Sequence, residues 1–289
     1  MRVLITGSTG QLGRALLRQA PVEHEITAVG HKDVDITSRE EVEKAVAVAA
    51  PQVIVNAAAY TAVDRAETER EQAFAANARG PQILARVAAA SGARLIHIST
   101  DFVFDGRAGT PYSADAVTNP LGIYGMSKCE GEQAVLQTTG CASVVLRTAW
   151  VYSAHGHNFV RTMLRLMKEK GQVRVVADQV GSPTSADSVA RALWAIASRP
   201  RIAGVHHWTD AGIASWYDFA VAIAEEAVVR GLLAGAVSVE PIATADFPTP
   251  ARRPAYSVLD KAATIGALGF GPQHWRNELR TVLEELQLG

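Results

Sequence analysis

The chain has 289 residues, 48% of them hydrophobic, with 28 basic and 29 acidic residues and a net charge of −1. No basic run suggests a nucleic-acid or anionic membrane partner, and no apolar run is long enough to span a bilayer. The cysteines, Cys129 and Cys141, are too few for a disulfide framework and lack metal-ligand spacing. We therefore expect a reduced, cytoplasmic protein without a signal peptide.

The first twenty residues predict a strand, a glycine-rich turn and a helix. The β-branched run Arg2–Thr6 leads into Gly7, Gly10 and Gly13, and a helical pattern covers Arg14–Ala20. A first glycine permits a tight turn, a second lets a phosphate approach the backbone, and a third lets helix and strand pack closely. The helix N-terminus offers free N–H groups to a pyrophosphate. The G-x-x-G-x-x-G spacing differs from the usual G-x-G-x-x-G, but its position after a strand favours a dinucleotide site.

Strand and helix patterns alternate through the first hundred residues. We expect strands at Glu25–Gly30, Gln52–Asn56 and Arg94–Ile98, and helices at Ser38–Ala49 and Asp64–Gly92, the last broken near Gly80-Pro81. Alternation with crossover-length connections predicts an α/β fold with a Rossmann-type, doubly wound parallel sheet. Ligands bind at the C-terminal edge of such sheets, where Gly7, Ala57, Thr100 and Ala149 would lie.

A helix over Pro120–Gln133 carries the pair Tyr124 and Lys128. Residues four apart share one face of a helix, so the phenol and the ammonium would point the same way. A neighbouring cation would lower the tyrosine pKa and make a general acid that works near neutrality. For the isolated pair, a helix surface with a snorkelling lysine is the more common alternative.

The second half of the chain has a looser pattern. A strand is expected at Cys141–Arg147, and the later elements are helices at Asn158–Lys170, Ala186–Ser198, Ser215–Arg230 and Gln273–Leu286, a strand at Gly204–Trp208, and loops at Asp178–Thr184 and Thr249–Pro254. We expect a cofactor domain over residues 1–150 and mainly a substrate-binding lobe over residues 151–289, with later sheet strands interleaved. We assign His97 to packing and give it no catalytic role.

The glycine motif, the polar strand end Ser99-Thr-Asp101 and Tyr124-Gly-Met-Ser-Lys128 together resemble the extended short-chain dehydrogenase/reductase family. The resemblance continues along nearly the whole chain through Asn56-Ala-Ala-Ala-Tyr-Thr-Ala-Val-Asp64, Arg147-Thr-Ala-Trp-Val-Tyr152, Asn158-Phe159, Asp178-Gln179-Val-Gly-Ser-Pro-Thr184 and Thr249-Pro-Ala-Arg-Arg-Pro254. Tyr256 is a departure, because the family usually has Asn there.

The resemblance implies a nucleotide-sugar reductase. The most similar members reduce the C4 ketone of dTDP-4-dehydro-6-deoxy-L-mannose with a nicotinamide hydride and form dTDP-L-rhamnose. Tyr124 would donate the proton, Lys128 would lower its pKa and hold the nicotinamide ribose, and Thr100 would orient the carbonyl. Two alternatives stay open: another nucleotide-sugar ketoreductase or epimerase, and a non-catalytic NADP-binding regulatory subunit.

The resemblance also assigns binding residues. The cofactor would contact Gly7, Thr9, Gly10, Gln11, Leu12, Gly13, Asp35, Ile36, Ala58, Ala59, Tyr60, Thr61, Tyr124 and Lys128. The substrate would contact Thr100, Asp101, Trp150, Asn158, Gln179 and Arg253. Trp150 could instead be a core aromatic, and Arg253 a solvated loop charge.

Cofactor choice and assembly follow from single positions. Lys32, after the second strand, could meet a 2′-phosphate, so NADPH should be at least as good a cofactor as NADH. Some relatives form Mg²⁺-bridged dimers, but here Arg14 follows the glycine motif in place of a carboxylate. Asp187 and Glu284 or Glu285 alone would make a weak site. We expect no metal, and a monomer or weak homodimer.

Overall fold

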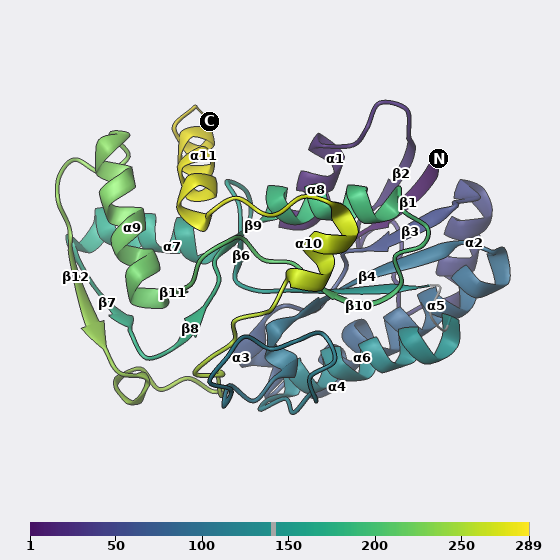
Figure 1. Cartoon of the computed structure of the whole chain (residues 1–289), viewed down its shortest axis with the longest axis horizontal. Helices are drawn as coiled ribbons and strands as arrows, with labels where there is room; N and C mark the ends of the chain where they lie inside the picture. The colour runs from purple at the N-terminus through teal and green to yellow at the C-terminus, as the bar shows by residue number, and fades with distance from the viewer. Residues whose placement is uncertain (140–142, 289) are drawn as a thin grey trace.

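A parallel six-stranded sheet forms the centre of the protein (Figure 1). The computed structural model describes residues 1–139 and 143–288. The strand order is β10-β5-β4-β3-β1-β2, and every neighbouring pair is parallel. This confirms the predicted α/β sheet. The strands are β1 (Arg2–Thr6), β2 (Glu25–Val29), β3 (Val53–Asn56), β4 (Arg94–Thr100), β5 (Val144–Thr148) and β10 (Gly204–His207).

Helices cover both faces of this sheet, because successive strand residues point to opposite sides. On β1, Val3 and Ile5 join the core with α1 (Gln11–Arg18) and α8 (Ala186–Ala197). Leu4, between them, packs into the opposite core. The helices of that second core are α2 (Arg39–Ala49), α5 (Gly80–Ser91) and α6 (Ile123–Thr139).

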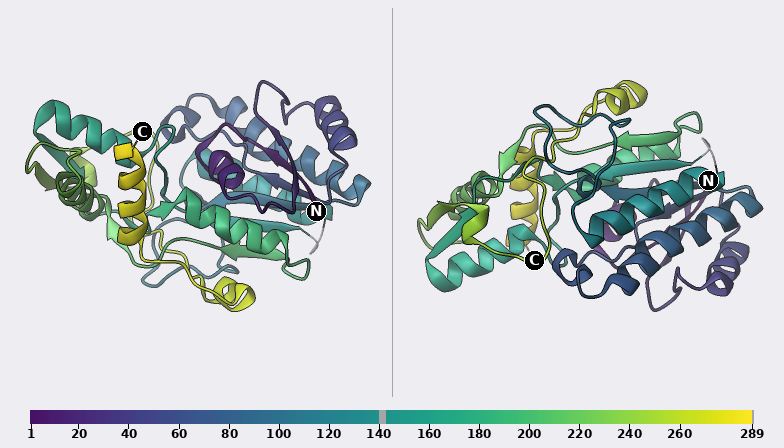
Figure 2. Two further views of the ribbon diagram at one scale, coloured as in Figure 1. Left: turned by 90° about the horizontal axis from the view of Figure 1, so that it is seen from above. Right: turned by 90° about the horizontal axis from the view of Figure 1, so that it is seen from below.

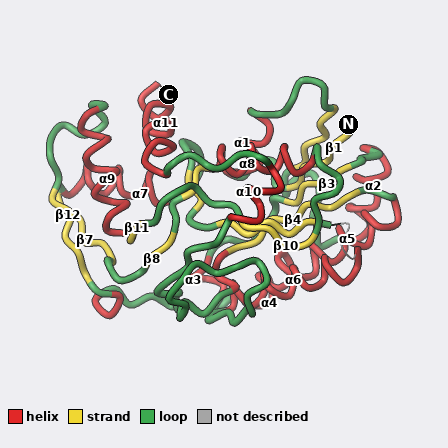
Figure 3. Tube along the Cα trace, in the orientation of Figure 1, coloured by secondary structure: helices red, strands yellow, loops and turns green. Residues whose placement is uncertain are grey.

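A second group of elements lies beside the sheet and has its own core (Figure 2). Helices α7 (Phe159–Lys170), α9 (Trp216–Val229) and α11 (Trp275–Leu288) pack there, and Phe219 and Leu279 are completely buried. Two strands that the sequence analysis did not predict, β7 (Gln172–Val176) and β12 (Ser238–Ile242), pair in parallel at the outer edge of this group (Figure 3).

The predicted break near Gly80-Pro81 is in the wrong place. The chain interrupts its helices earlier, between α3 (Val63–Ala66) and α4 (Arg70–Phe74), and a π-helical turn over Ala75–Arg79 then runs directly into α5. Proline is tolerated in the first turn of a helix, because its missing N–H would have no partner there. Pro81 therefore lies at the start of α5 and does not end a helix.

Smaller differences concern short or shifted elements. Helix α6 begins and ends later than predicted, and the loop Asp178–Thr184 contains the two-residue strand β8 (Val180–Gly181) and the start of β9 (Thr184–Ser185). Strands β6 (Val151–Tyr152) and β11 (Ala214–Ser215) and helix α10 (Ala262–Leu268) were not predicted. Cys141, at the start of a predicted strand, lies outside the described residues. Among the helices of residues 1–139 and 143–288, none combines the length and apolarity that crossing a membrane requires.

Candidate active site

A cavity of about 980 Å³ opens at the C-terminal edge of the sheet. Gly7, Ala57, Thr100 and Ala149, the residues expected at that edge, all line it. Its other wall comes from the second group of elements and includes Phe159 of α7 and Trp216 of α9. A volume of this size can enclose a ligand as large as a nucleotide together with a second small molecule.

The glycine turn between β1 and α1 has no room for a side chain at Gly7 or at Gly13. Gly7 has φ +70°, and a Cβ there would lie 2.5 Å from the Ala58 nitrogen. A Cβ at Gly13 would lie 2.2 Å from the Gly7 oxygen. Gly10 precedes α1 as its N-cap without a side-chain hydrogen bond, so first-turn N–H groups remain for a ligand. The turn therefore fits a pyrophosphate at a helix N-terminus.

The segment after β2 forms the rim of the same cavity. His31, Asp35 and Ile36 line it, whereas Lys32 is exposed and does not. The backbone N–H of Thr37 donates to Asp35 Oδ1 at 2.9 Å, and this hydrogen bond lowers the pKa of the Asp35 carboxyl. An ionised carboxylate thus lies where an adenosine ribose would be held in a dinucleotide site.

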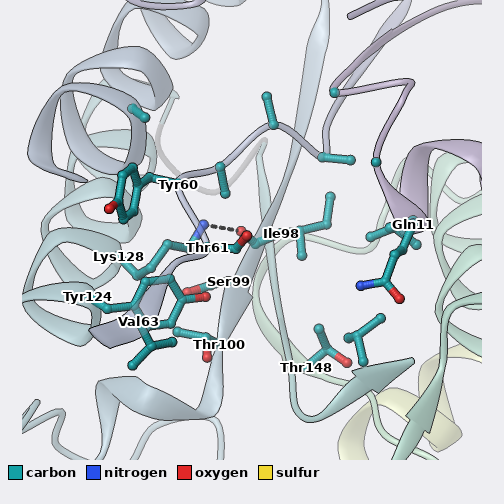
Figure 4. A pocket seen from close by; sticks show the side chains of 18 of the residues that line it. Gln11, Tyr60, Thr61, Val63, Ile98, Ser99, Thr100, Tyr124, Lys128 and Thr148 are labelled. Carbon is teal, nitrogen blue, oxygen red and sulfur yellow. Dashed lines mark hydrogen bonds between the residues drawn. The ribbon is translucent and has the colours of Figure 1, made fainter. Parts of the chain in front are cut away.

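Helix α6 delivers Tyr124 and Lys128 to the end of β4 (Figure 4). Gly125, between them in the sequence, lies against the Phe102 backbone, where a Cβ would be 2.2 Å from the carbonyl oxygen. This close approach of the helix to the chain after β4 is what brings both side chains to the cavity. Lys128 Nζ donates to the Ile98 carbonyl oxygen at 2.6 Å, and the Tyr124 ring packs edge-on against Phe102.

The predicted lowering of the tyrosine pKa is wrong for this arrangement. Burial raises the pKa of Tyr124 to about 12; a hydrogen bond with Thr100 opposes the rise and the charge of Asp101 adds to it. Burial also lowers the pKa of Lys128 to about 8, against the opposing effect of Glu132. Sequence spacing placed both groups on one helical face, but it contained no information about burial, which dominates both shifts.

The neighbouring ends of β4 and β5 carry several buried hydroxyl and carboxyl groups. Thr100 Oγ1 donates to Asp101 Oδ1 at 3.0 Å. Burial raises the pKa of Asp101 to about 6, against the effect of hydrogen bonds with Ser257 and Thr100. Within the described part of the chain, Ser99 Oγ and Thr148 Oγ1 are buried without a hydrogen-bond partner, and both residues line the cavity. Unpaired buried hydroxyls fit a polar ligand group at this edge.

An aromatic wall faces this end of the cavity. The rings of Trp150 and Trp216 stack with centroids 3.5 Å apart and planes 4° from parallel, and Phe159 packs on Trp216 at 4.6 Å. Trp150 has a φ of +48°, a left-handed conformation that is rare for a bulky residue. A Cβ at Gly181 would lie 2.6 Å from the Trp150 ring, so a glycine there makes room for the indole. Phe159 belongs to the motif Asn158-Phe159 but was given no site role, and Trp216 lies outside the motifs that carry the resemblance.

Arg253 reaches the cavity from the loop after β12. Its guanidinium donates from Nη1 to Asp64 Oδ1 at 3.0 Å and from Nη2 to Asp64 Oδ2 at 2.8 Å. Burial acts to raise the pKa of the Asp64 carboxyl, but the hydrogen bonds and charge of Arg253, with the Ala251 N–H, together lower it. Arg253 is therefore a fixed, partly neutralised cation at the cavity edge.

Three predicted site residues do not line the cavity. Asn158 caps α7 by accepting from the Arg161 N–H, and its Nδ2 donates to Gln11 Oε1 at 2.9 Å. Gln179 is buried and donates to Thr244 Oγ1 at 3.0 Å. Gly13 lies behind the glycine turn. The other predicted residues that line the cavity are Gly7, Thr9, Gly10, Gln11, Leu12, Asp35, Ile36, Ala58, Ala59, Tyr60, Thr61, Thr100, Asp101, Tyr124, Lys128, Trp150 and Arg253.

The carboxylates considered as magnesium ligands are paired with arginines. Arg18, not Arg14, lies between Asp187 at 2.6 Å and Glu285 at 2.9 Å. Over the described residues, no group of three or more His, Cys, Asp or Glu side chains is arranged to hold a metal ion.

Comparison with known proteins gives full-length matches. The family model described as RmlD substrate binding domain matches residues 1–288. A dTDP-4-dehydrorhamnose reductase of Aggregatibacter actinomycetemcomitans is 42% identical, over 97% of this chain and 98% of the relative. A probable dTDP-4,6-dihydroxy-2-methyloxan-3-one 4-ketoreductase of Streptomyces antibioticus is 43% identical, over 99% and 96%. The Bacillus anthracis dTDP-4-dehydrorhamnose reductase in complex with NADP superposes with a TM-score of 0.92 at 36% identity, over 98% of this chain and 99% of that one.

Proposed function

The chain belongs to the RmlD substrate binding domain family, and on this premise we propose that it reduces the C4 ketone of dTDP-4-dehydro-6-deoxy-L-mannose to give dTDP-L-rhamnose. This is the activity of a dTDP-4-dehydrorhamnose reductase, with NADPH as the reductant. The observation that carries the proposal is one cavity in which the glycine turn and the Thr100, Tyr124 and Lys128 side chains meet.

First-turn N–H groups of α1 would hold the cofactor's pyrophosphate at the glycine turn, where Gly10 has no side chain to block a phosphate. Asp35 and Ile36 would flank the adenosine, and the unpaired hydroxyls of Ser99 and Thr148 would offer donors and acceptors to the nicotinamide end. When bound, NADPH supplies the hydride that is added to the ketone carbon.

Tyr124 supplies the proton. Because burial raises the pKa of its phenol to about 12, Tyr124 is protonated at neutral pH and is ready to act as an acid. An alkoxide is a stronger base than a phenolate, so proton transfer from the phenol to the reduced carbonyl oxygen is favourable. Thr100 lies within hydrogen-bond reach of the phenol and orients the carbonyl. Lys128, held by Ile98, places a positive charge near the phenolate that forms.

The substrate occupies the cavity between this acid and the aromatic wall. Trp150 and Trp216 present a flat apolar surface to the deoxysugar, and Arg253 provides a cation for the diphosphate. Asn158 and Gln179 contribute indirectly, Asn158 through its hydrogen bond to Gln11, which lines the cavity, and Gln179 through its hydrogen bond to Thr244. In this proposal, residues 1–150 are mainly the cofactor domain and residues 151–289 mainly the substrate lobe. The enzyme works in the cytoplasm as a monomer or weak homodimer.

The direct test follows NADPH oxidation spectroscopically with freshly prepared dTDP-4-dehydro-6-deoxy-L-mannose and identifies the product by NMR. We expect dTDP-L-rhamnose in amounts equal to the NADPH consumed. Tight NADPH binding without turnover would overturn the proposal in favour of a regulatory NADP-binding protein.

A second candidate substrate comes from the similarity to the Streptomyces antibioticus protein. A parallel assay with dTDP-4,6-dihydroxy-2-methyloxan-3-one measures whether that dTDP-sugar is reduced with a higher kcat/KM. A higher value would assign the chain to a different ketoreduction at the same site.

A further inference from the structure

A buried chain of hydrogen-bonding side chains leads from the first strand to Lys128. Thr6 Oγ1 donates to Asn56 Oδ1 at 2.7 Å, Asn56 Nδ2 lies 3.0 Å from His97 Nδ1, and His97 Nε2 lies 3.5 Å from Lys128 Nζ. All four residues are at most 2% exposed. Because β1, β3 and β4 are neighbours in the sheet, this series of side chains runs across the sheet and ends at the cavity. His97, which the sequence suggested as a packing residue, is fully buried and also belongs to this series of polar contacts.

The backbone fixes the orientation of the Asn56 amide. The Ala58 N–H donates to Asn56 Oδ1 at 3.1 Å, and a backbone N–H can only donate. Asn56 Nδ2 must then face His97 Nδ1 as a donor. Burial and the charge of Lys128 hold the pKa of His97 well below its ordinary value, so the imidazole is neutral. With Nδ1 accepting, the single ring proton lies on Nε2.

The Nε2–H of His97 consequently points at Lys128. A protonated lysine has three N–H groups and no lone pair, so it cannot accept this hydrogen bond. A neutral lysine amine can accept it while still donating to the Ile98 carbonyl oxygen. The contact therefore stabilises the neutral form of Lys128 relative to the ammonium.

We propose that His97, locked in its Nε2–H tautomer by Asn56, is a positioning residue that lowers the proton affinity of Lys128 and sets the alkaline limit of activity. The proposal rests on the proposed function, in which Lys128 assists Tyr124 only while it is protonated. It deepens that function by naming the group that controls this protonation.

Other groups near Lys128 do not explain the same effect. Glu132, one turn further along α6, favours the ammonium, and its carboxylate is paired with Arg147 at 2.7 Å. Tyr124, on the same helical face, is neutral until far above neutrality. Burial is the largest effect that opposes the charge of Lys128, and His97 is the residue on β4 whose ring nitrogen faces the Lys128 ammonium, at 3.5 Å.

The first test needs no variant and no turnover. Long-range ¹⁵N–¹H NMR spectra of the wild-type protein distinguish the two imidazole tautomers, and we expect the Nε2–H form for His97. The Nδ1–H form would overturn the proposal, because Nε2 would then accept from the ammonium and stabilise it. This result stands whether or not the protein reduces a dTDP-sugar.

The second test compares His97→Asn with the matched variant His206→Asn. In His97→Asn, the new amide still offers Asn56 a hydrogen-bond partner near the former Nδ1 position. The Nε2–H group that faces Lys128 in the wild type is lost. His206 is on β10, away from the cavity lining, and contacts Thr264 and Ala203. We expect the Lys128 titration, followed by NMR of lysine-labelled protein and assigned with Lys128→Met, to move up by about one pH unit in His97→Asn only.

The alkaline limb of the kcat profile should move with it, because both report one group. An unchanged or lowered Lys128 titration in folded His97→Asn would overturn the proposal. A shifted titration without turnover of any dTDP-sugar would confirm the coupling and refute the proposed function instead.

Discussion

Asp64 accepts two hydrogen bonds from the Arg253 guanidinium, at 3.0 and 2.8 Å, although 189 positions separate these residues in the chain. The pair joins the segment after β3 to the loop after β12, at the edge of the cavity. A bidentate carboxylate fixes the plane of a guanidinium, and lysine cannot reproduce this geometry. The pair therefore determines where the cavity cation lies.

We expect Arg253→Lys to raise the KM for the dTDP-sugar about tenfold, since the charge is kept and the orientation is lost. The kcat should change much less, because Arg253 is remote from the proton donor in the proposed mechanism. Asp64→Asn should act in the same direction. Arg252→Lys, at the exposed neighbouring position, is the matched control. Equal kinetics for all three variants would remove the pair from substrate binding.

Tyr124→Phe removes the proton donor and keeps the ring that packs on Phe102. We expect kcat to fall by about 10²-fold or more, with NADPH affinity retained in a fluorescence titration. Tyr217→Phe, in the lobe core outside the cavity lining, controls for the loss of a phenol. A Tyr124→Phe enzyme within a few-fold of wild type would require another acid.

NADPH should be at least as good a cofactor as NADH when kcat/KM values are compared. Lys32 is exposed beside His31, which lines the cavity, and in the proposed mode of cofactor binding its ammonium would meet a 2′-phosphate. Lys32→Ala should therefore lower kcat/KM for NADPH and leave NADH unchanged, whereas Lys44→Ala on α2 should change neither. A wild-type preference for NADH would contradict this assignment.

Asp210 should make the protein less stable as the pH rises from about 4 to 7. Its Oδ2 accepts from the Ser185 N–H at 2.8 Å, and burial raises its pKa to about 7. Between the unfolded and folded pKa values the folded state binds the extra proton, so stability is highest at low pH and falls through this window. Asp210→Asn should abolish this part of the pH dependence, about 2 to 4 kcal/mol by the size of the shift.

Urea unfolding of wild type and Asp210→Asn at pH 4 and pH 8 measures this difference. Asp105→Asn should remove a pH dependence of the opposite sign. Hydrogen bonds lower the pKa of the Asp105 carboxyl, so its contribution to the free energy of unfolding is lost as the pH falls. If the free energy of unfolding changed equally with pH in wild type and Asp210→Asn, ionisation of Asp210 would not destabilise the folded protein, and the prediction would be wrong.

Chelation with EDTA should change neither the mass in light scattering nor the rate of NADPH oxidation. Arg18 already neutralises Asp187 and Glu285, and Arg230 pairs with Glu284 at 2.9 Å. Mg²⁺ would have to displace these guanidinium groups to gain carboxylate ligands. A loss of mass or activity that Mg²⁺ restores would contradict the prediction.

The parts of the fold that depend on local pattern could be predicted. Strand β1 has its predicted bounds, and the glycine turn lines the cavity together with Tyr124 and Lys128, whose spacing places them on one helix face. The β7–β12 pair was missed, since each of these strands pairs with a segment far along the chain and lies outside the alternating pattern of the first hundred residues. Tyr124 shows the other limit: its spacing from Lys128 was correct, but burial reversed the expected pKa shift.

The contacts that shape the substrate side could not be read from the sequence. Trp216 and Asp64 come from separate segments and become relevant only when folding brings them to Trp150 and Arg253. Asn158 and Gln179 were predicted from their motifs to contact the substrate, but each is hydrogen-bonded to another side chain and does not line the cavity. A position in a motif does not say which way a side chain points.

The Trp150–Trp216 stack is an intrinsic spectroscopic probe of the protein's conformation. Trp150 follows the sheet strand β5, whereas Trp216 begins α9 in the adjoining group, so their contact joins two bodies of the fold. Indoles at 3.5 Å and nearly parallel interact electronically, and their coupled transitions give a circular dichroism signal that isolated tryptophans lack. Any rotation of α9 against β5 would separate the rings and change this signal, so a movement of the two groups of elements on ligand binding can be measured without an added label.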